Sequence, residues 1–423
     1  MKLNEMQKKV VYSDERFLFL LAGAGSGKTR VVIEKIKYLL SKDVQTDDIL
    51  ALTFTNKAAN EMKKRIGRDD MRIHTFHQFC YQELKKHCNY TYKIFEETLT
   101  TEFTKKDLLE ISVYKNSLYR KQKPKKYDLY QNYLLIYQYK DFDDLLIDFL
   151  TYIKLYKTFH FKYIFVDEFQ DTNELQYQIL KQLIQKQTHC LCVGDPDQSI
   201  YQFRGANPSI IHKYIKDFDA NIETLTINYR SNETIVSHAN RLIKRNYRKY
   251  KKELVSYNKQ TKHIFSYLFM DYDEEANFIM NQISMWIKQG IKAHNIAILY
   301  RQHHRAYHLV DTFKRHEVYY YQDQVKPYEQ SVSVISVHQA KGLEFDAVII
   351  LGLEANMFPS HKTDQHLFLE EERRLMFVAI TRAKEHLIYT HIKYNDYFQR
   401  QKPSLFIRES GLKSKVYKHN NDI

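Results

Sequence analysis

The sequence predicts an α/β protein that has two parallel-sheet cores, with a small helical insertion in the first core. Short apolar runs bounded by turn or polar residues recur along the chain, and they have the length of buried strands. Stretches with helical periodicity, such as 30–40 and 56–66, lie between them, and strands that alternate with helices favour a parallel sheet. The strand pattern starts again in the second half of the chain, which indicates a second core.

The predicted strands and the composition between them define the expected domains. The apolar runs lie at 17–22, 49–55, 163–166 and 190–193 in the first core, and at 224–227, 296–300, 332–337, 347–353 and 386–392 in the second. Residues 88–138 are rich in Lys and Tyr, lack an apolar strand run and predict the helical insertion. We therefore place the first core at 1–87 and 139–215, the second core at 216–400 and a polar tail at 401–423.

The composition is that of a folded protein with a basic surface. The 423 residues include 65 Lys and Arg against 51 Asp and Glu, a formal charge of +14, and 43% of residues are hydrophobic. This length suits two or three domains, and this hydrophobic content excludes a disordered chain. The charge favours an anionic partner such as nucleic acid, although a solvated basic surface would give the same count.

The cysteines and the N-terminal segment indicate a soluble protein of a reducing compartment. Cys80, Cys88, Cys190 and Cys192 have neither the spacing of a zinc site nor that of a disulfide framework, so we expect buried thiols. The N-terminal residues do not have the form of a signal peptide, and the apolar run 17–22 is too short to span a bilayer. We expect a cytoplasmic protein with no membrane partner.

A glycine-rich segment has the context of a phosphate-binding loop. The strand FLFLLA runs into GAGSGKT at 23–29, and a helix begins near Arg30. Lys28 would place a charge at the β and γ phosphates, and Thr29 would ligate Mg²⁺. A chance glycine-rich turn is the alternative, but the strand and helix on either side favour a loop that binds a nucleoside triphosphate. The small residues that let backbone N–H groups close around the phosphates are Ala22, which stands where the common pattern has Gly, Gly23, Ala24, Gly25, Ser26 and Gly27.

Two adjacent carboxylates follow another predicted strand, in the segment YIFVDEFQD at 163–171. They lie at the carboxyl end of that strand, where ligands bind in α/β sheets. Asp167 suits a Mg²⁺ ligand, and Glu168 is placed to orient and deprotonate an attacking water. Such a pair alone is often only surface charge. Together with the phosphate loop it predicts an enzyme that hydrolyses nucleotide triphosphate.

The chain resembles the UvrD/Rep/PcrA type of superfamily 1 helicases, because further motifs similar to those of that family occur in order. They lie at 3–7 (LNEMQ), 51–62, 73–80, 141–146 (DFDDLL), 193–206 (VGDPDQSIYQFRGA), 228–231 (NYRS), 296–301, 334–352 and 370–387. The resemblance covers most of the chain. It implies two RecA-like cores of the P-loop NTPase class with ATP between them, and movement along single-stranded DNA with 3′ to 5′ polarity.

The resemblance also implies roles in ATP binding for residues outside the phosphate loop. Gln7 would hydrogen-bond adenine, Arg30 and Tyr229 would flank its ring, and Glu344 would contact the ribose. Gln198 would sense the γ-phosphate. Arg230 and Arg382 would act as arginine fingers, which stabilise charge on the transferring phosphoryl group. An isolated arginine would be read as a surface or ion-pair residue, and only the motifs NYRS and AITRAK favour the catalytic role.

For DNA, the resemblance points to aromatic residues that stack on bases and to polar residues beside them. Stacking on aromatic faces does not depend on base sequence, as a motor requires. Position 203 is commonly Trp in the family, so Phe203 would keep a stacking face but lose area; core packing is the alternative role for these aromatic residues. The DNA-facing residues implied are Phe54, Asn56, Tyr201, Phe203 and Arg204, with His77 and His338 as further candidates.

The sequence departs from the family between the IAILYR and VHQAKGLEF motifs, where relatives carry a large mobile subdomain. Residues 302–332 can hold only one helix and a turn, which puts strand separation in doubt more than ATP hydrolysis. The basic segment 119–127 could contact phosphates, but it could equally be a solvated face. Asp143 and Asp144 open a predicted helix and would stabilise its N-terminus, so they receive no catalytic role.

Three functions remain open at this level. The first is an ATP-driven 3′ to 5′ translocase or helicase on single-stranded DNA, with or without a duplex junction, in repair, replication or phage defence. The second is a regulatory ATP-binding subunit that gates a partner nuclease or repair protein. The third is a motor on RNA, because base stacking does not distinguish ribose from deoxyribose. ATP and Mg²⁺ are the expected cofactors in each.

Overall fold

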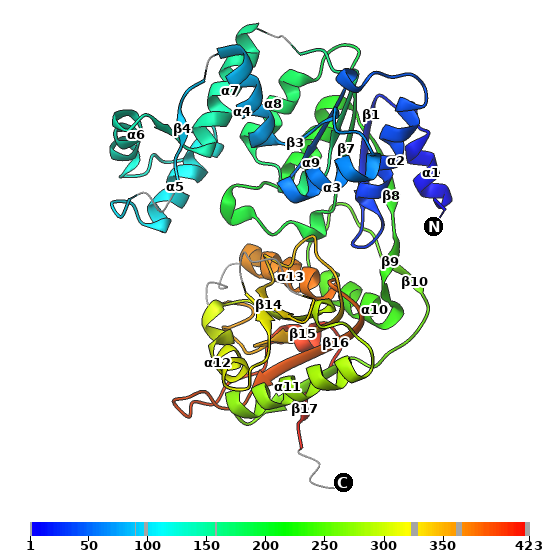
Figure 1. Ribbon diagram of the computed structural model, residues 1–423, viewed down its shortest axis with the longest axis vertical. Helices are drawn as coiled ribbons and strands as arrows, with labels where there is room; N and C mark the ends of the chain where they lie inside the picture. The colour runs from blue at the N-terminus through cyan, green and yellow to red at the C-terminus, as the bar shows by residue number, and fades with distance from the viewer. Residues whose placement is uncertain are drawn as a thin grey trace. The chain divides into compact units, whose positions relative to one another are not determined.

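The computed structural model describes residues 2–88, 90–96, 100–156, 159–322, 329–360 and 366–418, except the side chains of Arg204, His366 and Leu367. The chain divides into two compact units. The first comprises Met1–Ala22 with Gly27–Leu225, and the second comprises Gly23–Ser26 with Thr226–Ile423. Each unit is built on a parallel β-sheet flanked by helices, which confirms the predicted fold class (Figure 1).

The first unit contains a six-stranded sheet in the order β3-β2-β6-β7-β1-β8. Every neighbouring pair in this sheet is parallel. The strands are β1 (Phe17–Ala22), β2 (Ile49–Thr53), β3 (Arg72–Thr75), β6 (Tyr163–Val166), β7 (His189–Gly194) and β8 (Asn221–Leu225). Because parallel strands end at the same edge, the segments after β1, β2, β6 and β7 all leave the sheet at one edge.

Helices cover both faces of this sheet, so its central strands are continuously apolar. On one face, Leu20 and Val193 share a core with residues of α1, α2 and α3. On the other face, the Phe19 ring packs against Phe169, which contacts Tyr214 of α9. The helices of this unit outside the insertion are α1 (Glu5–Val11), α2 (Lys28–Leu40), α3 (Asn56–Ile66), α4 (Phe76–Cys88), α7 (Phe142–Tyr156), α8 (Glu174–Leu183) and α9 (Ser209–Phe218).

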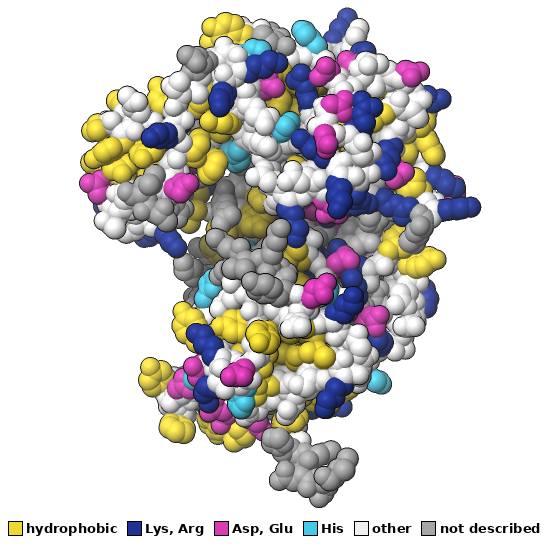
Figure 2. Space-filling model, viewed as in Figure 1, with side chains coloured by type: hydrophobic (Ala, Val, Ile, Leu, Met, Phe, Trp, Pro, Cys, Tyr) yellow, Lys and Arg dark blue, Asp and Glu magenta, His cyan; other side chains and the backbone are white. Residues whose placement is uncertain are grey.

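The segment at 88–138 is helical, with a small sheet at its base. It contains α5 (Lys105–Asn116), α6 (Tyr127–Ile136) and β4 (Lys93–Ile94), which pairs with β5 (Tyr139–Lys140). A separate apolar cluster fills it, formed by Phe95, Phe103, Ile111, Tyr130 and Leu134. Leu135 and Ile136 at the end of α6 are each 73% exposed, and apolar side chains gather at this part of the surface (Figure 2, upper left).

Asp144, at the start of α7, joins the insertion to the first core. Its carboxylate and that of Asp141 lie 2.7 and 2.6 Å from the fully buried Nζ atom of Lys115 on α5. Asp143 accepts a hydrogen bond of 2.7 Å from Asn116. Asp143 and Asp144 lie in the first turn of α7, as expected. The structure adds a second role, because both contact residues at the C-terminal end of α5.

The second unit contains a seven-stranded sheet in the order β13-β14-β12-β15-β16-β11-β17, also parallel throughout its described pairs. A two-stranded ribbon of β9 and β10 accompanies it. The strands are β9 (Ile227–Asn232), β10 (Val255–Asn258), β11 (Phe265–Phe269), β12 (Ile296–Tyr300), β13 (Tyr320–Tyr321), β14 (Val332–Ser336), β15 (Phe345–Leu351), β16 (Ala383–Ile392) and β17 (Lys415–Val416).

The described helices of the second unit are α10 (Glu233–Ile243), α11 (Tyr272–Lys288), α12 (Tyr307–Arg315), α13 (His366–Ile380) and α14 (Leu405–Glu409). The short segment 302–332 carries α12, preceded by a 3-10 turn at His303–Ala306. In that turn, the buried Arg305 pairs with Glu275 at 2.7 Å and Glu354 at 2.8 Å. These ion pairs anchor the segment to α11 and to the chain that follows β15. Residues 323–328 of this segment lie outside the described part.

Three details differ from the sequence predictions. The run at 224–227 is not one strand of the second core, because residues 224–225 end β8 of the first sheet and β9 begins at Ile227. The polar segment after Pro403 is not only a tail, because it forms α14 and β17, and β17 pairs with β11. Cys88 is exposed instead of buried, while the other three thiols are buried as expected. Within the described residues, no helix combines the length and apolarity needed to cross a bilayer.

Candidate functional site

The phosphate loop lies between β1 and α2, as its sequence predicts. Gly25 and Gly27 have φ angles of +67° and +83°, in the left-handed region that side chains with a Cβ atom rarely adopt. The Ser26 backbone N–H and hydroxyl both donate to the Gly23 carbonyl oxygen, at 3.3 and 2.8 Å. Gly27 then occupies the N-cap position of α2, so Lys28 and Thr29 form the first turn of that helix. The backbone N–H groups of a helix N-terminus bind anions, which suits a phosphate here.

Four polar side chains meet at the carboxyl edge of the first sheet. The Thr29 hydroxyl donates to Asp167 Oδ2 at 2.8 Å, and Lys28 Nζ lies 3.6 Å from Glu168 Oε1. The backbone N–H of Glu168 donates to Asp167 Oδ1 at 2.9 Å. The structure thus brings together the loop residues and the carboxylates that the sequence assigned to one site.

Asp167 is buried, and this changes its acidity. Burial and the neighbouring Glu168 carboxylate raise the pKa of Asp167 to about 6, against the opposing effect of Lys28. A divalent cation would offset both effects and favour the carboxylate form. The Thr29 hydroxyl and the Asp167 carboxylate are adjacent oxygen donors, the kind that Mg²⁺ prefers. This pair therefore fits the expected metal.

Gln198 lies in the 3-10 turn Pro196–Gln198, which follows β7. Its Nε2 atom donates to Asp195 Oδ2 at 2.5 Å, and both residues are buried. The backbone N–H of Asp195 donates to the Gln170 side chain at 2.8 Å, and Gln170 in turn donates to Glu168. The sequence predicted no role for Gln170 or Asp195. Both lie inside motifs named above, YIFVDEFQD and VGDPDQSIYQFRGA. A polar side chain close to a predicted site residue was the only sequence feature that could have indicated a role.

Gln7 lies beside the phosphate loop. It is 1% exposed and occupies the third position of α1, where it forms a capping box with Asn4. A Cβ atom at Gly27 would come within 3.1 Å of Gln7 Nε2. The amide nitrogen of Gln7 is thus next to the loop, while its oxygen accepts from the Asn4 backbone N–H at 3.0 Å. Arg30 is partly buried in the first turns of α2.

The nucleotide residues predicted in the second unit lie close together in that unit. Arg230, on β9, donates from Nε to Glu344 at 2.8 Å and from an Nη atom to the Thr381 carbonyl oxygen at 3.2 Å. Arg382, which follows Thr381, is 2% exposed and donates to the carbonyl oxygens of Val378 and Leu343. Arg382 therefore has a packing role here that its motif did not indicate.

Asn228 lies in the NYRS motif, and the sequence predicted no role for it. Gly23–Ser26 belong to the second unit by their contacts, and Asn228 contributes to this, because its Nδ2 atom donates to the Ala24 carbonyl oxygen at 2.8 Å. The backbone N–H of Tyr229 donates to the Gly25 carbonyl oxygen at 2.9 Å. The Tyr229 ring packs against Tyr257, with centroids 5.1 Å apart.

The predicted DNA-facing aromatic residues of the first unit form one cluster. The Phe54 ring, after β2, stacks on Tyr201, after β7, with centroids 5.0 Å apart and planes 19° from parallel. Phe203 follows at 6.2 Å from Tyr201, and Phe54 and Phe203 remain 36% and 44% exposed. Two segments far apart in the sequence thus present stacked rings on the first unit.

The remaining DNA candidates differ in placement. Asn56 is exposed at the first position of α3, next to Phe54. His77 contacts Phe142 edge-on, and burial lowers its pKa to about 4, so it is neutral near pH 7 and offers no charge to a phosphate. The Arg204 side chain lies outside the described residues. His338 lies in the second unit after β14 and is partly buried.

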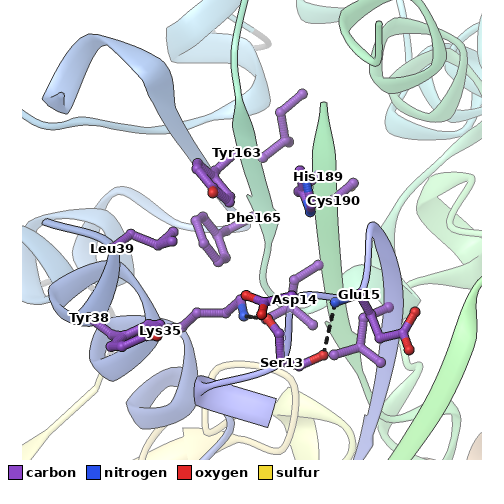
Figure 3. Close-up of a pocket in the computed structure, with 13 residues that line it drawn as sticks. Ser13, Asp14, Glu15, Lys35, Tyr38, Leu39, Tyr163, Phe165, His189 and Cys190 are labelled. Atoms are coloured by element: carbon purple, nitrogen blue, oxygen red, sulfur yellow. Dashed lines mark hydrogen bonds between the residues drawn. The ribbon is translucent and has the colours of Figure 1, made fainter. Parts of the chain in front are cut away.

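A small pocket lies elsewhere, at the amino-terminal ends of β1, β6 and β7. Lys35 extends along it and donates to the Ser13 carbonyl oxygen at 2.6 Å (Figure 3). It also donates to the Val10 carbonyl oxygen at 3.2 Å. Burial lowers the pKa of Lys35 to about 8. Because the phosphate loop follows the carboxyl end of β1, this pocket is at the opposite sheet edge from the nucleotide residues.

The fold and these side chains are those of a P-loop nucleoside triphosphatase. Comparison with known families gives the particular class. The UvrD/REP helicase N-terminal domain matches residues 3–110 and 88–219, and the UvrD-like helicase C-terminal domain matches residues 223–328 and 320–394. The chain belongs to the UvrD/REP helicase family.

Similar proteins include a probable DNA helicase of Mycoplasma pneumoniae, 31% identical over 96% of this chain and 86% of that protein. The ATP-dependent DNA helicase PcrA of Staphylococcus aureus is 34% identical over 75% of this chain and 50% of that protein. PcrA of Bacillus subtilis is 36% identical over 71% of this chain and 47% of that protein. The chain thus spans about half the length of these PcrA relatives.

Proposed function

We propose that this protein is an ATP-dependent motor that moves along single-stranded DNA from 3′ to 5′. The observation that carries the proposal is the cluster of Lys28, Thr29, Asp167 and Glu168 at the edge of the first sheet. Membership of the UvrD/REP family and the names of the similar proteins support ATP and DNA as the ligands. The polarity rests on the family resemblance.

The residues at this cluster suggest how hydrolysis would proceed. Mg²⁺ bound at Thr29 and Asp167 would neutralise charge on the β and γ phosphates. Lys28 would bind the same phosphates, which would release Glu168 from its contact with the Lys28 ammonium group. The freed carboxylate would then orient the attacking water and accept its proton. Gln198, Arg230 and Arg382 are proposed to act on the γ-phosphate, and Gln7, Arg30, Tyr229 and Glu344 on the nucleoside.

The stacked pair Phe54 and Tyr201, with Phe203 beside it, is proposed to bind bases. Each base stacked on an aromatic ring contributes about 1–3 kcal/mol and does not depend on base identity. Asn56, Arg204, His77 and His338 are proposed as further contacts to the strand. The +14 charge would attract the phosphate backbone from solution.

A second candidate is a regulatory ATP-binding subunit that gates a nuclease or repair protein. The short segment 302–332, with α12 anchored by Arg305, favours this candidate, because the family resemblance implies a large subdomain at that place. Such a subunit would bind and hydrolyse ATP but separate little duplex by itself. Both candidates place the protein in the cytoplasm, with a role in DNA repair, replication or defence.

Steady-state ATP hydrolysis with and without single-stranded DNA distinguishes the two candidates. Lys28→Ala and Glu168→Gln should each abolish hydrolysis, and Glu168→Gln should retain ATP binding. Stimulation by DNA supports the motor. Hydrolysis that DNA does not change would contradict the motor and favour the regulatory subunit. Single-stranded RNA in place of DNA tests the third alternative directly.

A further inference from the structure

Gln170 is a fully buried side chain between the catalytic carboxylate and the segment that carries the stacked aromatic residues. It lies in the 3-10 turn Phe169–Asp171 and is 0% exposed. Both ends of its amide form hydrogen bonds: Nε2 donates to Glu168 Oε2, and Oε1 accepts from the Asp195 backbone N–H at 2.8 Å. A side chain with only one of these two functions could not make both contacts.

Further hydrogen bonds join the same two segments. The Ser199 hydroxyl donates to the Gln170 carbonyl oxygen at 3.3 Å, and the Asn207 backbone N–H donates to the Thr172 carbonyl oxygen at 3.2 Å. Hydrogen bonds at several positions thus join the turn after β6 to the segment 194–207. That segment contains Gln198 as well as Tyr201 and Phe203, so one nucleotide candidate and two DNA candidates of the first unit share one stretch of chain.

Close packing makes this contact sensitive to position. A Cβ atom at Gly194 would come within 2.8 Å of Gln170 Oε1, so the strand end can approach the amide only because residue 194 is glycine. Glu168 has a φ angle of +53°, which non-glycine residues rarely adopt. A shift of the 194–207 segment would therefore move the Gln170 amide, and with it the carboxylate of Glu168.

We propose that Gln170 is a positioning residue that transmits DNA engagement at Tyr201 and Phe203 to the orientation of Glu168. This inference rests on the proposed function of a DNA-stimulated ATPase and adds the physical link. When bases stack on the rings, the 194–207 segment is held in one position. The Asp195 backbone N–H then fixes the Gln170 amide, and the amide orients Glu168 toward the attacking water. Without DNA, stacked bases do not hold that segment in place, so the Gln170 amide orients Glu168 less precisely and hydrolysis is slow.

The link can be tested with two substitutions and a matched control. Gln170→Met removes both hydrogen-bonding functions at similar volume, and Gln170→Glu replaces the donor by a carboxylate that repels Glu168. Gln178→Met changes a partly exposed glutamine on α8 whose Nε2 atom donates to Glu174 at 3.1 Å, one helical turn earlier. The measurements are kcat and KM for ATP with and without single-stranded DNA, DNA affinity by anisotropy, and the thermal unfolding midpoint.

We expect both Gln170 variants to lose up to about 100-fold in DNA-stimulated kcat, as a misplaced catalytic group does, with KM for ATP and DNA affinity close to wild type. In Gln170→Glu, stimulation should recover as pH falls, because protonation of the new carboxyl restores a donor. Gln178→Met should behave as wild type. Stimulation that survives in Gln170→Met would overturn the inference, as would equal loss of ATP binding, DNA binding and thermal stability. If the wild type itself shows no stimulation, the proposed function fails instead.

Discussion

Phe203 shows how a single residue sets the strength of the proposed DNA contact. It is 44% exposed and lies next to the stacked pair Phe54 and Tyr201. We expect Phe203→Ala to weaken single-stranded DNA binding by about 1–3 kcal/mol, the contribution of one stacked base. Phe203→Trp should bind as tightly as wild type or more tightly, because indole offers a larger face.

Anisotropy titrations at one fixed salt concentration measure this effect, since DNA affinity changes steeply with salt. Tyr12→Ala is a suitable control, because Tyr12 is a 53% exposed aromatic residue of the first unit that packs on Tyr38, away from the cluster. Equal DNA affinities for wild type and Phe203→Ala would show that Phe203 is only a surface residue.

Thr29 offers a second test at the residue scale, directed at the metal. Its hydroxyl lies 2.8 Å from Asp167 Oδ2, and the two oxygens are the proposed Mg²⁺ ligands. Thr29→Val keeps the shape of the side chain but removes the oxygen. We expect ATP hydrolysis by this variant to need higher Mg²⁺, whereas Thr29→Ser should follow the wild type. Titration of the ATPase rate with Mg²⁺ checks this, and an unchanged requirement in Thr29→Val would remove Thr29 from the metal site.

At the scale of elements, Lys35 on α2 gives a prediction about pH and stability. Burial lowers its pKa to about 8 from 10.5, so the folded protein releases this proton before the unfolded chain does. A lowered pKa in the fold means that stability is gained as pH rises from about 8 to about 10.5. Relative to Lys35→Met, the free energy of unfolding of the wild type should therefore rise by roughly 3 kcal/mol across this pH range.

Chemical denaturation of both proteins at several pH values measures that difference. Lys37→Met is the matched control, because Lys37 is exposed two residues later on the same helix. A free-energy difference between wild type and Lys35→Met that stays constant from pH 7 to 11 would show that Lys35 keeps an ordinary pKa in the fold.

The elements that sequence predicted well are those buried on both faces. β1, β6 and β12 are continuous apolar runs, and the structure places strands at these residues. β3 and β11 were not predicted, because most residues of each strand are only partly buried and neither forms a continuous apolar run. β17 is a two-residue edge strand, and only pairing with β11 defines it. Local sequence pattern does not contain such tertiary information.

The candidate site divides in the same way. The phosphate loop and the carboxylates after β6 were predictable, because strand, loop and helix follow one another directly in the sequence. Gln170 was not, since its role depends on Asp195, which β7 brings to the same edge of the sheet. Nor did any pattern indicate that Arg382 would be buried against backbone carbonyl oxygens.

At the scale of the whole molecule, the combination of the proposed ATP and DNA residues with a short 302–332 segment leads to a prediction about strand separation. If the chain has no further duplex-handling part there, it must wait for thermal opening of the base pair ahead. Opening one base-pair step costs about 1.4 kcal/mol on average, which corresponds to roughly a tenfold lower rate per step. We therefore expect unwinding of a 3′-tailed duplex to be about tenfold slower than translocation on single-stranded DNA.

The base composition of the duplex distinguishes this passive mode from active separation. Stacking free energies range from about 0.6 to 2.2 kcal/mol per step, so a passive motor should slow markedly on stable GC-rich duplexes and much less on AT-rich ones. Stopped-flow translocation on oligonucleotides and unwinding of two duplexes of equal length give the three rates. Unwinding at the translocation rate on both duplexes would show that residues within this chain destabilise the junction actively. Translocation with no unwinding of either duplex would assign strand separation to a partner, as the regulatory-subunit candidate requires.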